Sequence, residues 1–149
     1  MSEHRITLKW FKGDVPFTYD TYTRNHQVTF KDGAPVTFSA AAPYHGDPSK
    51  GDPEDMLVAA LSSCHMLSFL AICAKKRITV EAYDDEAVGV LEKDPSMGSG
   101  GKIWMTRVTL RPKVRADADS ATLQQVHHLA HQACFIANSV KTQVLVEPR

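Results

Sequence analysis

The sequence has little cysteine, no excess of charge and no apolar segment at its amino terminus. Its 149 residues include three cysteines, and 17 basic residues balance 17 acidic ones. A neutral chain offers no electrostatic attraction to nucleic acid or to an anionic membrane surface. Three cysteines make no disulfide framework, so in a reducing cytoplasm they serve packing or chemistry. The polar, alternating start MSEHRITLKW is unlike a signal peptide, and we expect a cytoplasmic protein.

The sequence also lacks an uninterrupted hydrophobic run of membrane-spanning length. The longest apolar stretch, residues 56–74, is broken by four polar residues: Ser62, Ser63, His65 and Ser68. Polar groups at these positions favour burial within protein over contact with lipid. A hydrophobic content of 43% and a charged content of 23% are typical of globular proteins. We therefore expect a single domain over residues 1–149, with no membrane and no nucleic-acid partner.

Local patterns predict three strands, a long helix, two longer strands, a second helix and a closing strand. The first three strands fall within residues 5–10, 23–30 and 35–40, and Asp32-Gly33 favours a hairpin between the last two. The first strand alternates Ile6, Leu8 and Trp10 with polar residues, as a half-buried strand does. Strands followed by helices in this grouping indicate an α+β fold.

The long helix should begin at Pro53, with Asp52 as its N-cap, and run to about Lys76. The longer strands span residues 78–94 and 102–114, joined by a flexible segment at 95–101. A second helix should start near Asp119 and carry apolar residues as far as Ala137, and residues 142–147 form the last strand.

The long helix is apolar on nearly every face, so it needs cover on all sides. Two small groups of strands from one chain provide little of that cover, and we therefore expect a homodimer. Four small residues would let a second helix approach closely: Ala59, Ala60, Ser62 and Ser63.

The spacing of the cysteines excludes one pairing and makes another geometrically reasonable. Cys64 and Cys73 lie nine residues apart on one helix, which places them on opposite sides and about 13 Å apart along its axis. Disulfide-bonded Cα atoms lie within about 7 Å, so these two do not pair. Cys64 and Cys134 each lie on the apolar stripe of a predicted helix, and the two stripes should face one core. For Cys73 we expect inert packing, as for most buried cysteines.

A reactive cysteine in the middle of a helix needs a nearby positive charge. Lowering a thiol pKa from about 8.5 to about 5.5 requires roughly 4 kcal/mol of preferential stabilisation of the anion. The helix dipole fades within the first turn, and burial acts in the opposite direction. His65 points about 100° away from Cys64 around the helix, so an arginine from elsewhere in the fold is the better source.

Two segments resemble motifs of the OsmC/Ohr family. DPEDMLVAALSSCHMLSFLA, residues 52–71, resembles the central-helix motif, and HQACFIANSVKTQV, residues 131–144, resembles the second cysteine motif with its Asn-Ser pair. YTRNHQVTF, residues 22–30, is similar to the arginine-bearing strand of one branch. The segment SSCHM departs from the best-studied branches, which carry a different and often aromatic residue after the cysteine.

The resemblance implies a fold, an activity and four site residues. The fold would be an intertwined α+β homodimer, with a long central helix from each chain wrapped by two groups of strands. The activity would be thiol-dependent reduction of organic hydroperoxides or hydrogen peroxide in oxidative-stress defence, with an external dithiol as reductant. Cys64 would be the peroxidatic cysteine, Cys134 the resolving cysteine, Arg24 the activating cation and Glu54 the carboxylate that orients it. Glu54 would lie about 15 Å from Cys64 on one helix, so we expect each site to use Glu54 of the other subunit.

The histidines predict no cofactor. His127 and His131 have the i, i+4 spacing of metal ligands on a helix, but no third ligand is near in sequence, so we expect a solvated helix face and no metal. His65 and His26 are candidates for lining the substrate pocket.

Two other functions stay open at this point. One is a cysteine hydrolase that uses Cys64 with His65, although neighbouring residues on a helix diverge. The other is a protein of the same fold that holds a small apolar ligand without catalysis.

Overall fold

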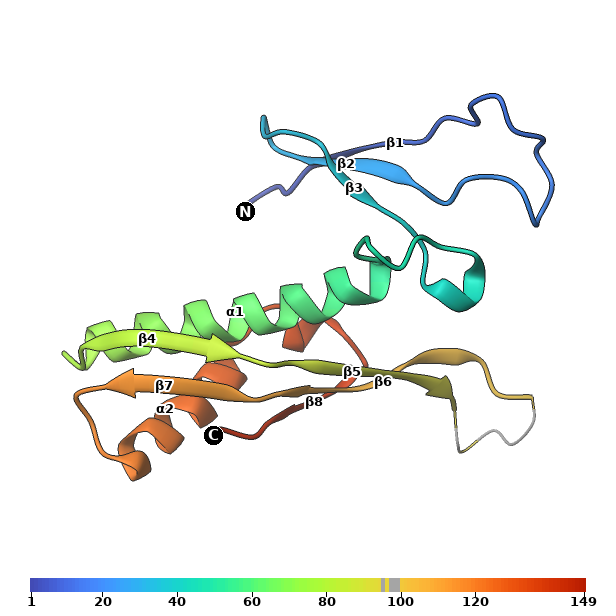
Figure 1. The fold of residues 1–149 in the computed structure, drawn as a ribbon. Coiled ribbons are helices and arrows are strands. Elements are labelled where there is room, and N and C mark those ends of the chain that lie inside the picture. The colour runs from blue at the N-terminus through green and yellow to red at the C-terminus, as the bar shows by residue number, and fades with distance from the viewer. Residues whose placement is uncertain (95, 97–99) are drawn as a thin grey trace. The chain divides into compact units, whose positions relative to one another are not determined.

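The computed structural model describes residues 1–94, 96 and 100–149 of the chain. The chain divides into two compact units, residues 1–56 and 57–149. Their eight described strands and two α-helices confirm the α+β fold (Figure 1). Most of the flexible segment predicted at residues 95–101 lies outside the described residues, and the single domain expected from the sequence stays a prediction.

The first unit contains an antiparallel sheet of three short strands in the order β1-β2-β3. The strands are β1 (Ile6–Lys9), β2 (His26–Phe30) and β3 (Val36–Phe38), and the hairpin predicted at Asp32-Gly33 joins the last two. Every residue of β1 is exposed in the single chain, so the half-buried strand expected there is wrong for one chain. An alternating apolar and polar pattern is typical of a strand that packs against another layer on one face. Within its own unit, β1 has no such layer packed on it.

Helix α1 (Pro53–Lys75) has the predicted start and ends one residue before the predicted end. Asp52 caps it as expected, because its Oδ1 accepts a hydrogen bond of 2.9 Å from the backbone N–H of Asp55. The helix stops where Arg77 adopts a left-handed backbone conformation with φ of 60°. The N–H of Ile78 then bonds the carbonyl of Cys73 at 2.9 Å, which satisfies one of the open carbonyls of the last turn.

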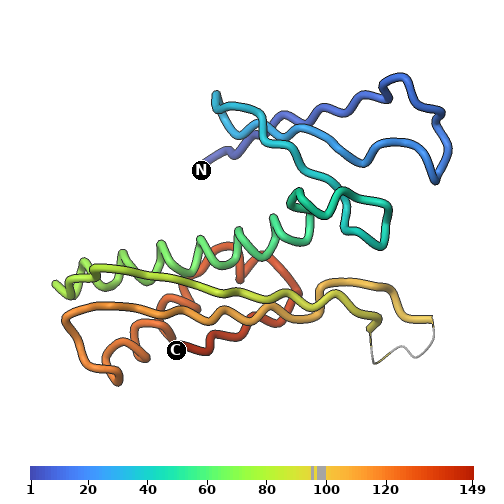
Figure 2. The backbone as a smooth tube through the Cα atoms, viewed as in Figure 1, coloured from blue at the N-terminus to red at the C-terminus, as the bar shows by residue number. Residues whose placement is uncertain are grey.

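The two long strands predicted in the second unit are each divided in two. Strands β4 (Val80–Asp85) and β5 (Val88–Lys93) follow one another along one path, and β6 (Ile103–Leu110) and β7 (Pro112–Ala116) run back beside them. Figure 2 shows these two paths as long, nearly straight segments of the tube. β4 pairs with β7 in one sheet, whereas β5 and β6 form a second sheet with β8 (Gln143–Val146), which runs parallel to β6.

The side chain of Asp85 explains why the paired strands change sheets. Its Oδ1 accepts the N–H of Arg111 at 2.7 Å, so this backbone donor bonds a side chain instead of the opposite strand. Its Oδ2 accepts a hydrogen bond of 2.5 Å from Ser62 Oγ. Asp85 thus ends the β4–β7 ladder and ties α1 to it. Ser62 therefore faces the sheet, which corrects its expected place among small residues open to a second helix.

Helix α2 (Ser120–Ala133) begins at the predicted cap, where Asp119 accepts the N–H of Thr122 at 2.7 Å. It ends before Cys134, so the helix predicted to reach Ala137 is too long; residues 137–139 form a separate short 3-10 turn.

The buried face of α1 is narrower than the sequence suggested. Its buried residues recur every fourth position: Leu61, His65, Phe69 and Cys73. Leu61 packs with Met105, Val108 and Leu110 in one core cluster, and Phe69 and Cys73 pack with Val126 and Ala130 of α2 in another. The apolar stripe on which Cys64 was expected to face the core, with Leu57, Ala60, Leu61, Leu67 and Ala71, is only partly buried. Leu57 and Leu61 pack in the core, whereas the other three residues line a groove.

Much of α1 stays uncovered in the single chain. By length and composition the helix could cross a membrane. Core helices of water-soluble proteins can have the same length and composition. Only 22% of its most apolar window is buried within the chain. The described residues of the second unit therefore leave this apolar surface without a cover.

Candidate functional site

Cys64 and Cys134, 70 positions apart in the sequence, come together in the second unit. The side chain of Cys64 lies close enough to that of Cys134 to raise the pKa of the Cys134 thiol, after the larger effect of burial. Both cysteines are free thiols in this structure. Cys64 is half-buried on α1, whereas Cys134 is 1% exposed. The structure thus brings together two of the four predicted site residues.

The end of α2 positions Cys134. Cys134 is the C-cap residue, with an extended backbone, and its N–H reaches back to the carbonyl of His131 at 3.3 Å. Its Sγ accepts the N–H of Ala137 at 3.5 Å, and its carbonyl accepts the N–H of Asn138 at 3.0 Å. The chain therefore turns at Cys134, and one of these three hydrogen bonds is made to the sulfur itself.

The two thiols differ in their electrostatic surroundings. Burial, followed by the interaction with Cys64, raises the pKa of the Cys134 thiol to about 11. Cys134 therefore stays protonated near neutral pH. Of the pair, Cys64 is the sulfur placed to act as a nucleophile toward an external molecule, because it alone borders a groove.

The groove beside Cys64 has a volume of about 590 Å³ and is mostly apolar. Its lining comes from one face of α1 and the segment after α2: Ala60, Ser63, Cys64, Leu67, Ser68, Ala71, Ile72, Lys75, Ala133, Phe135 and Ile136. Such a surface can receive the apolar part of a small molecule and leave its reactive group at the sulfur.

Cys73 lies in the core, as predicted for inert packing. It is 1% exposed, and burial raises the pKa of its thiol. It does not line the groove, and it packs with Phe69, Val126 and Ala130.

Arg24 belongs to the first unit, where its guanidinium is held in a defined orientation. It donates one hydrogen bond of 2.6 Å to the carbonyl of Tyr22 and another to the carbonyl of Tyr19. Its Cζ lies 3.7 Å from the ring centroid of Tyr22 and 5.2 Å from that of Tyr19, as in cation–π contacts. The side chain is largely buried, and its Nε has no hydrogen-bond partner among the described residues.

Glu54 lies in the first turn of α1, as predicted, and is half-buried. Within residues 1–94, 96 and 100–149 it forms no ion pair, and Arg24 likewise pairs with no carboxylate. The expected contact between these two residues is therefore not made inside one chain.

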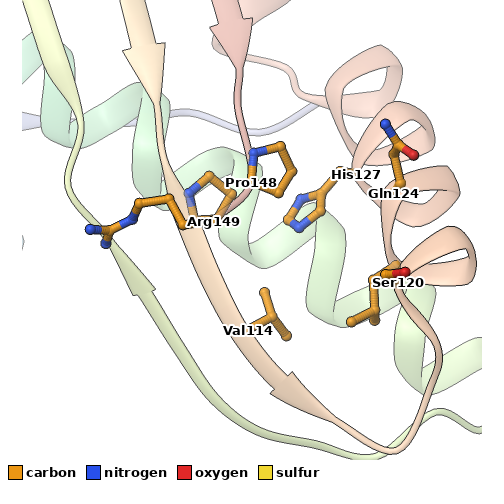
Figure 3. Close-up of a pocket in the computed structure, with 8 residues that line it drawn as sticks. Val114, Ser120, Gln124, His127, Pro148 and Arg149 are labelled. Carbon is orange, nitrogen blue, oxygen red and sulfur yellow. The ribbon is translucent and has the colours of Figure 1, made fainter.

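His65 and His127 form a buried pair between α1 and α2, which the sequence did not predict. Their nitrogens Nε2 and Nδ1 lie 3.1 Å apart, and the rings are parallel to within 6°. Phe69 stacks on His127 at a centroid distance of 4.2 Å. The solvated face expected for His127 is wrong: the residue is 3% exposed, although it is among the residues that line a surface pocket (Figure 3).

The other predictions for histidines are compared with the structure one residue at a time. His131 is half-buried, and its Nδ1 is buried without a partner in the described chain, so it does not lie on a fully solvated face either. His65 does not line the groove, which corrects its expected role there. The Nδ1–H of His26 donates a hydrogen bond of 2.9 Å to the carbonyl of Arg24, and its ring stacks on Phe38. Among the described residues, no cluster of three or more His, Cys, Asp or Glu side chains is arranged to hold a metal ion.

Comparison with known proteins places the chain in a family. Residues 46–149 match the family described as OsmC-like protein, which is more than two thirds of the sequence. The chain belongs to the OsmC-like family. A structure of an OsmC-like protein of unknown function from Vibrio cholerae is 44% identical, with 100% of both chains covered and a TM-score of 0.88. Comparison with curated proteins found no match.

More distant OsmC-like structures share the fold. An organic hydroperoxide resistance protein OsmC from Legionella pneumophila is 17% identical, with 99% of this chain and 97% of that chain covered and a TM-score of 0.69. The organic hydroperoxide resistance protein OhrB of Bacillus subtilis is 20% identical, with 99% and 98% covered and a TM-score of 0.67. These likenesses extend over nearly the whole chain, including the first unit.

Acidification should destabilise the protein through the histidine pair. Burial lowers the pKa of both His65 and His127 to about 4, from an ordinary value near 6.5. The unfolded chain therefore binds more protons between these values, so the free energy of unfolding falls as the pH drops from about 6.5 to 4. We expect a loss on the order of 3 kcal/mol, measured by urea denaturation at pH 7 and pH 4.5.

The exposed His128 on the same helix provides the control for this measurement. His128→Gln should show the same loss as the parent protein, whereas His65→Gln/His127→Asn should lose clearly less. An equal loss in all three proteins would assign the pH dependence to other groups.

Proposed function

We propose that the protein is a thiol-dependent peroxidase that reduces organic hydroperoxides, and hydrogen peroxide as a smaller substrate, in defence against oxidative stress. Two structural relatives are named organic hydroperoxide resistance proteins. The observation that carries the proposal is the proximity of Cys64 and Cys134, with Cys64 bordering an apolar groove.

In the first step, the Cys64 thiolate attacks one oxygen of the O–O bond. The S–O bond forms as the O–O bond breaks, and the leaving alkoxide takes a proton and departs as alcohol. Cys64 is oxidised to a sulfenic acid and the peroxide is reduced. The apolar groove holds the organic part of the substrate, which favours organic hydroperoxides over hydrogen peroxide.

In the second step, the Cys134 sulfur attacks the sulfenic sulfur of Cys64. A disulfide forms and water leaves. An external dithiol then reduces the disulfide by exchange and is itself oxidised, which restores both thiols. Cys134 suits this role because it is buried, protonated and already beside Cys64.

Arg24 is proposed as the cation that stabilises the Cys64 thiolate. A buried charge is costly unless it is compensated. Two carbonyls and two aromatic rings compensate the guanidinium in part, and no carboxylate neutralises it among the described residues. The group thus retains the capacity to bind an anion such as a thiolate or a peroxide.

A homodimer is proposed as the working form, with Glu54 supplied by the other subunit. Each unit leaves one apolar surface uncovered by its own residues. One is the groove along α1, and the other is the sheet of the first unit, where Ile6, Leu8, Phe30 and Val36 are exposed. A second copy that covers both would also bring a second Glu54.

The two alternative functions are less well supported. A hydrolase would need His65 as the base for Cys64, but His65 is turned into the core, hydrogen-bonded to His127, and has a pKa lowered to about 4 by burial. A ligand-binding protein without catalysis is compatible with the apolar groove, but it gives no reason for two thiols to meet there.

Peroxide consumption with matched cysteine variants tests the proposed activity. Cys64→Ser should reduce turnover of cumene hydroperoxide with dithiothreitol by at least about 100-fold, because the attacking sulfur is removed. Cys134→Ser should accumulate the Cys64 sulfenic acid, detected by dimedone labelling and mass spectrometry. Cys73→Ala is the control and should keep turnover within about twofold. Unchanged turnover in Cys64→Ser would exclude the proposal.

Alkylation of Cys64 tests the role of Arg24. Arg24→Met should slow the reaction of Cys64 with iodoacetamide at pH 7 by about tenfold or more, since only the thiolate reacts and a tenfold loss corresponds to about 1.4 kcal/mol. Arg5→Met, which removes an exposed arginine of the same unit, is the control. Equal rates in both variants would mean that another cation acts on Cys64.

Mixed dimers test the shared site. Cys64→Ser and Glu54→Gln should each be inactive alone, and mixing them should restore activity to about a quarter of the parent level or more after subunit exchange. In the mixed dimer, the intact Cys64 then meets the intact Glu54 of the other subunit. No restoration, with dimers confirmed by sedimentation, would place Glu54 and Cys64 of one chain in the same site.

A further inference from the structure

The contact between α1 and α2 contains one polar interaction close to both cysteines. His65 directly follows Cys64 on α1, and His127 precedes Cys134 by seven residues, which is about two helical turns. The surrounding contact is apolar and is made by Phe69, Cys73, Val126 and Ala130. The histidine pair thus lies in the contact between the two helices, next to Cys64 in sequence and about two helical turns before Cys134.

A hydrogen bond between two imidazoles fixes the helices more narrowly than apolar packing does. Nε2 of His65 and Nδ1 of His127 must lie about 3 Å apart, with one nitrogen protonated and the other bare. Apolar side chains tolerate small rotations and shifts of one helix on another, whereas a buried hydrogen bond is lost by them. Because Cys64 is one residue from His65, any rotation of α1 on α2 also moves its sulfur.

Disulfide formation depends strongly on such movements. A disulfide needs a sulfur–sulfur distance of about 2.05 Å and a dihedral angle near 90°. Attack of a peroxide from the groove makes no such demand on the relative placement of the two helices. The two steps of the proposed reaction should therefore respond differently to a loosened helix contact.

We propose that the His65–His127 pair is a positioning device that holds Cys134 against Cys64 for disulfide formation, and that it works only while both imidazoles are uncharged. This deepens the proposed function, since it concerns the same two cysteines. A proton on the accepting nitrogen would leave two N–H groups facing each other and break the bond. The charged and titratable groups around the pair are His131 on α2 and Asp85 and Tyr83 on β4.

Those neighbours do not compensate a charged pair fully. His131 acts on His65 in the same direction as burial, and both lower its pKa, whereas Asp85 opposes them with a smaller effect. The carboxylate of Asp85 is already engaged by Ser62 and by the backbone of Arg111. Tyr83 is uncharged, because burial and Asp85 raise its pKa.

The test measures the effective concentration of the two thiols by equilibration with reduced and oxidised glutathione. This quantity needs no peroxide, so it is independent of whether the protein is a peroxidase. His127→Phe keeps the ring that stacks on Phe69 but removes the hydrogen bond, and it should lower the effective concentration by about tenfold. His65→Gln/His127→Asn replaces the imidazole pair with an amide pair of similar reach and should restore it to within about threefold. His128→Phe, at an exposed position of α2, is the matched control and should leave it unchanged.

The pH dependence separates positioning from a general loss of structure. The parent protein should keep its effective concentration between pH 7 and pH 5 and lose it, relative to the amide pair, as the pH falls through about 4, because the imidazoles take up protons there and amides do not titrate. This comparison also serves if His127→Phe fails to fold by circular dichroism. An unchanged value in a folded His127→Phe, or the same pH dependence in the parent and the amide pair, would overturn the proposal.

Discussion

The packing of α1 against α2 is the constraint on which the site depends. Four residues at every fourth position of α1 are buried, and this narrow stripe sets the rotation of the helix. His65 belongs to this stripe. Cys64, one residue earlier, lies at the edge of the stripe, where it is half-buried and borders the groove. Helix α2 ends at Ala133, and the chain turns immediately afterwards. The buried Cys134 therefore lies near the same edge of the stripe.

The unequal burial of the two thiols assigns them different chemistry. A thiol with a pKa of about 11 is ionised to only about one part in ten thousand at pH 7, which would make Cys134 a poor nucleophile toward a dissolved molecule. A reacting group held beside its target gains an effective concentration that reaches about 10⁵ M or more in well-oriented cases. The intrinsic nucleophilicity of a thiolate also rises with its pKa. Burial therefore protects Cys134 from external oxidants without preventing attack on a neighbouring sulfur.

The sequence predicted the elements more accurately than their packing. Asp52 and Asp119 act locally through their own helix N-termini, so both caps were predictable. The division of the long strands depends on Asp85, which bonds a backbone group 26 residues away, and no local pattern contains that contact. The proximity of Cys64 and Cys134 was predicted from an apolar helix stripe that does not include Cys134, because α2 ends at Ala133. The histidine pair was missed because His65 and His127 look polar in sequence, and only their mutual hydrogen bond makes burial acceptable.

The surface of α1 must satisfy two requirements that partly conflict. An apolar helix with so little of its surface buried in its own chain requires cover, and the small residues Ala60, Ser63 and Ala71 allow a second helix to pack closely there. The same face borders the sulfur that must stay accessible. Larger side chains, Leu67 and Phe135, are exposed on the groove and can keep a covering helix from closing completely over Cys64. In the proposed reaction the O–O unit is only two atoms long, so a narrow opening at the sulfur would be sufficient, and the remaining apolar wall would receive the organic part of the substrate. Cover and access are therefore compatible if the second helix crosses the groove to one side of Cys64.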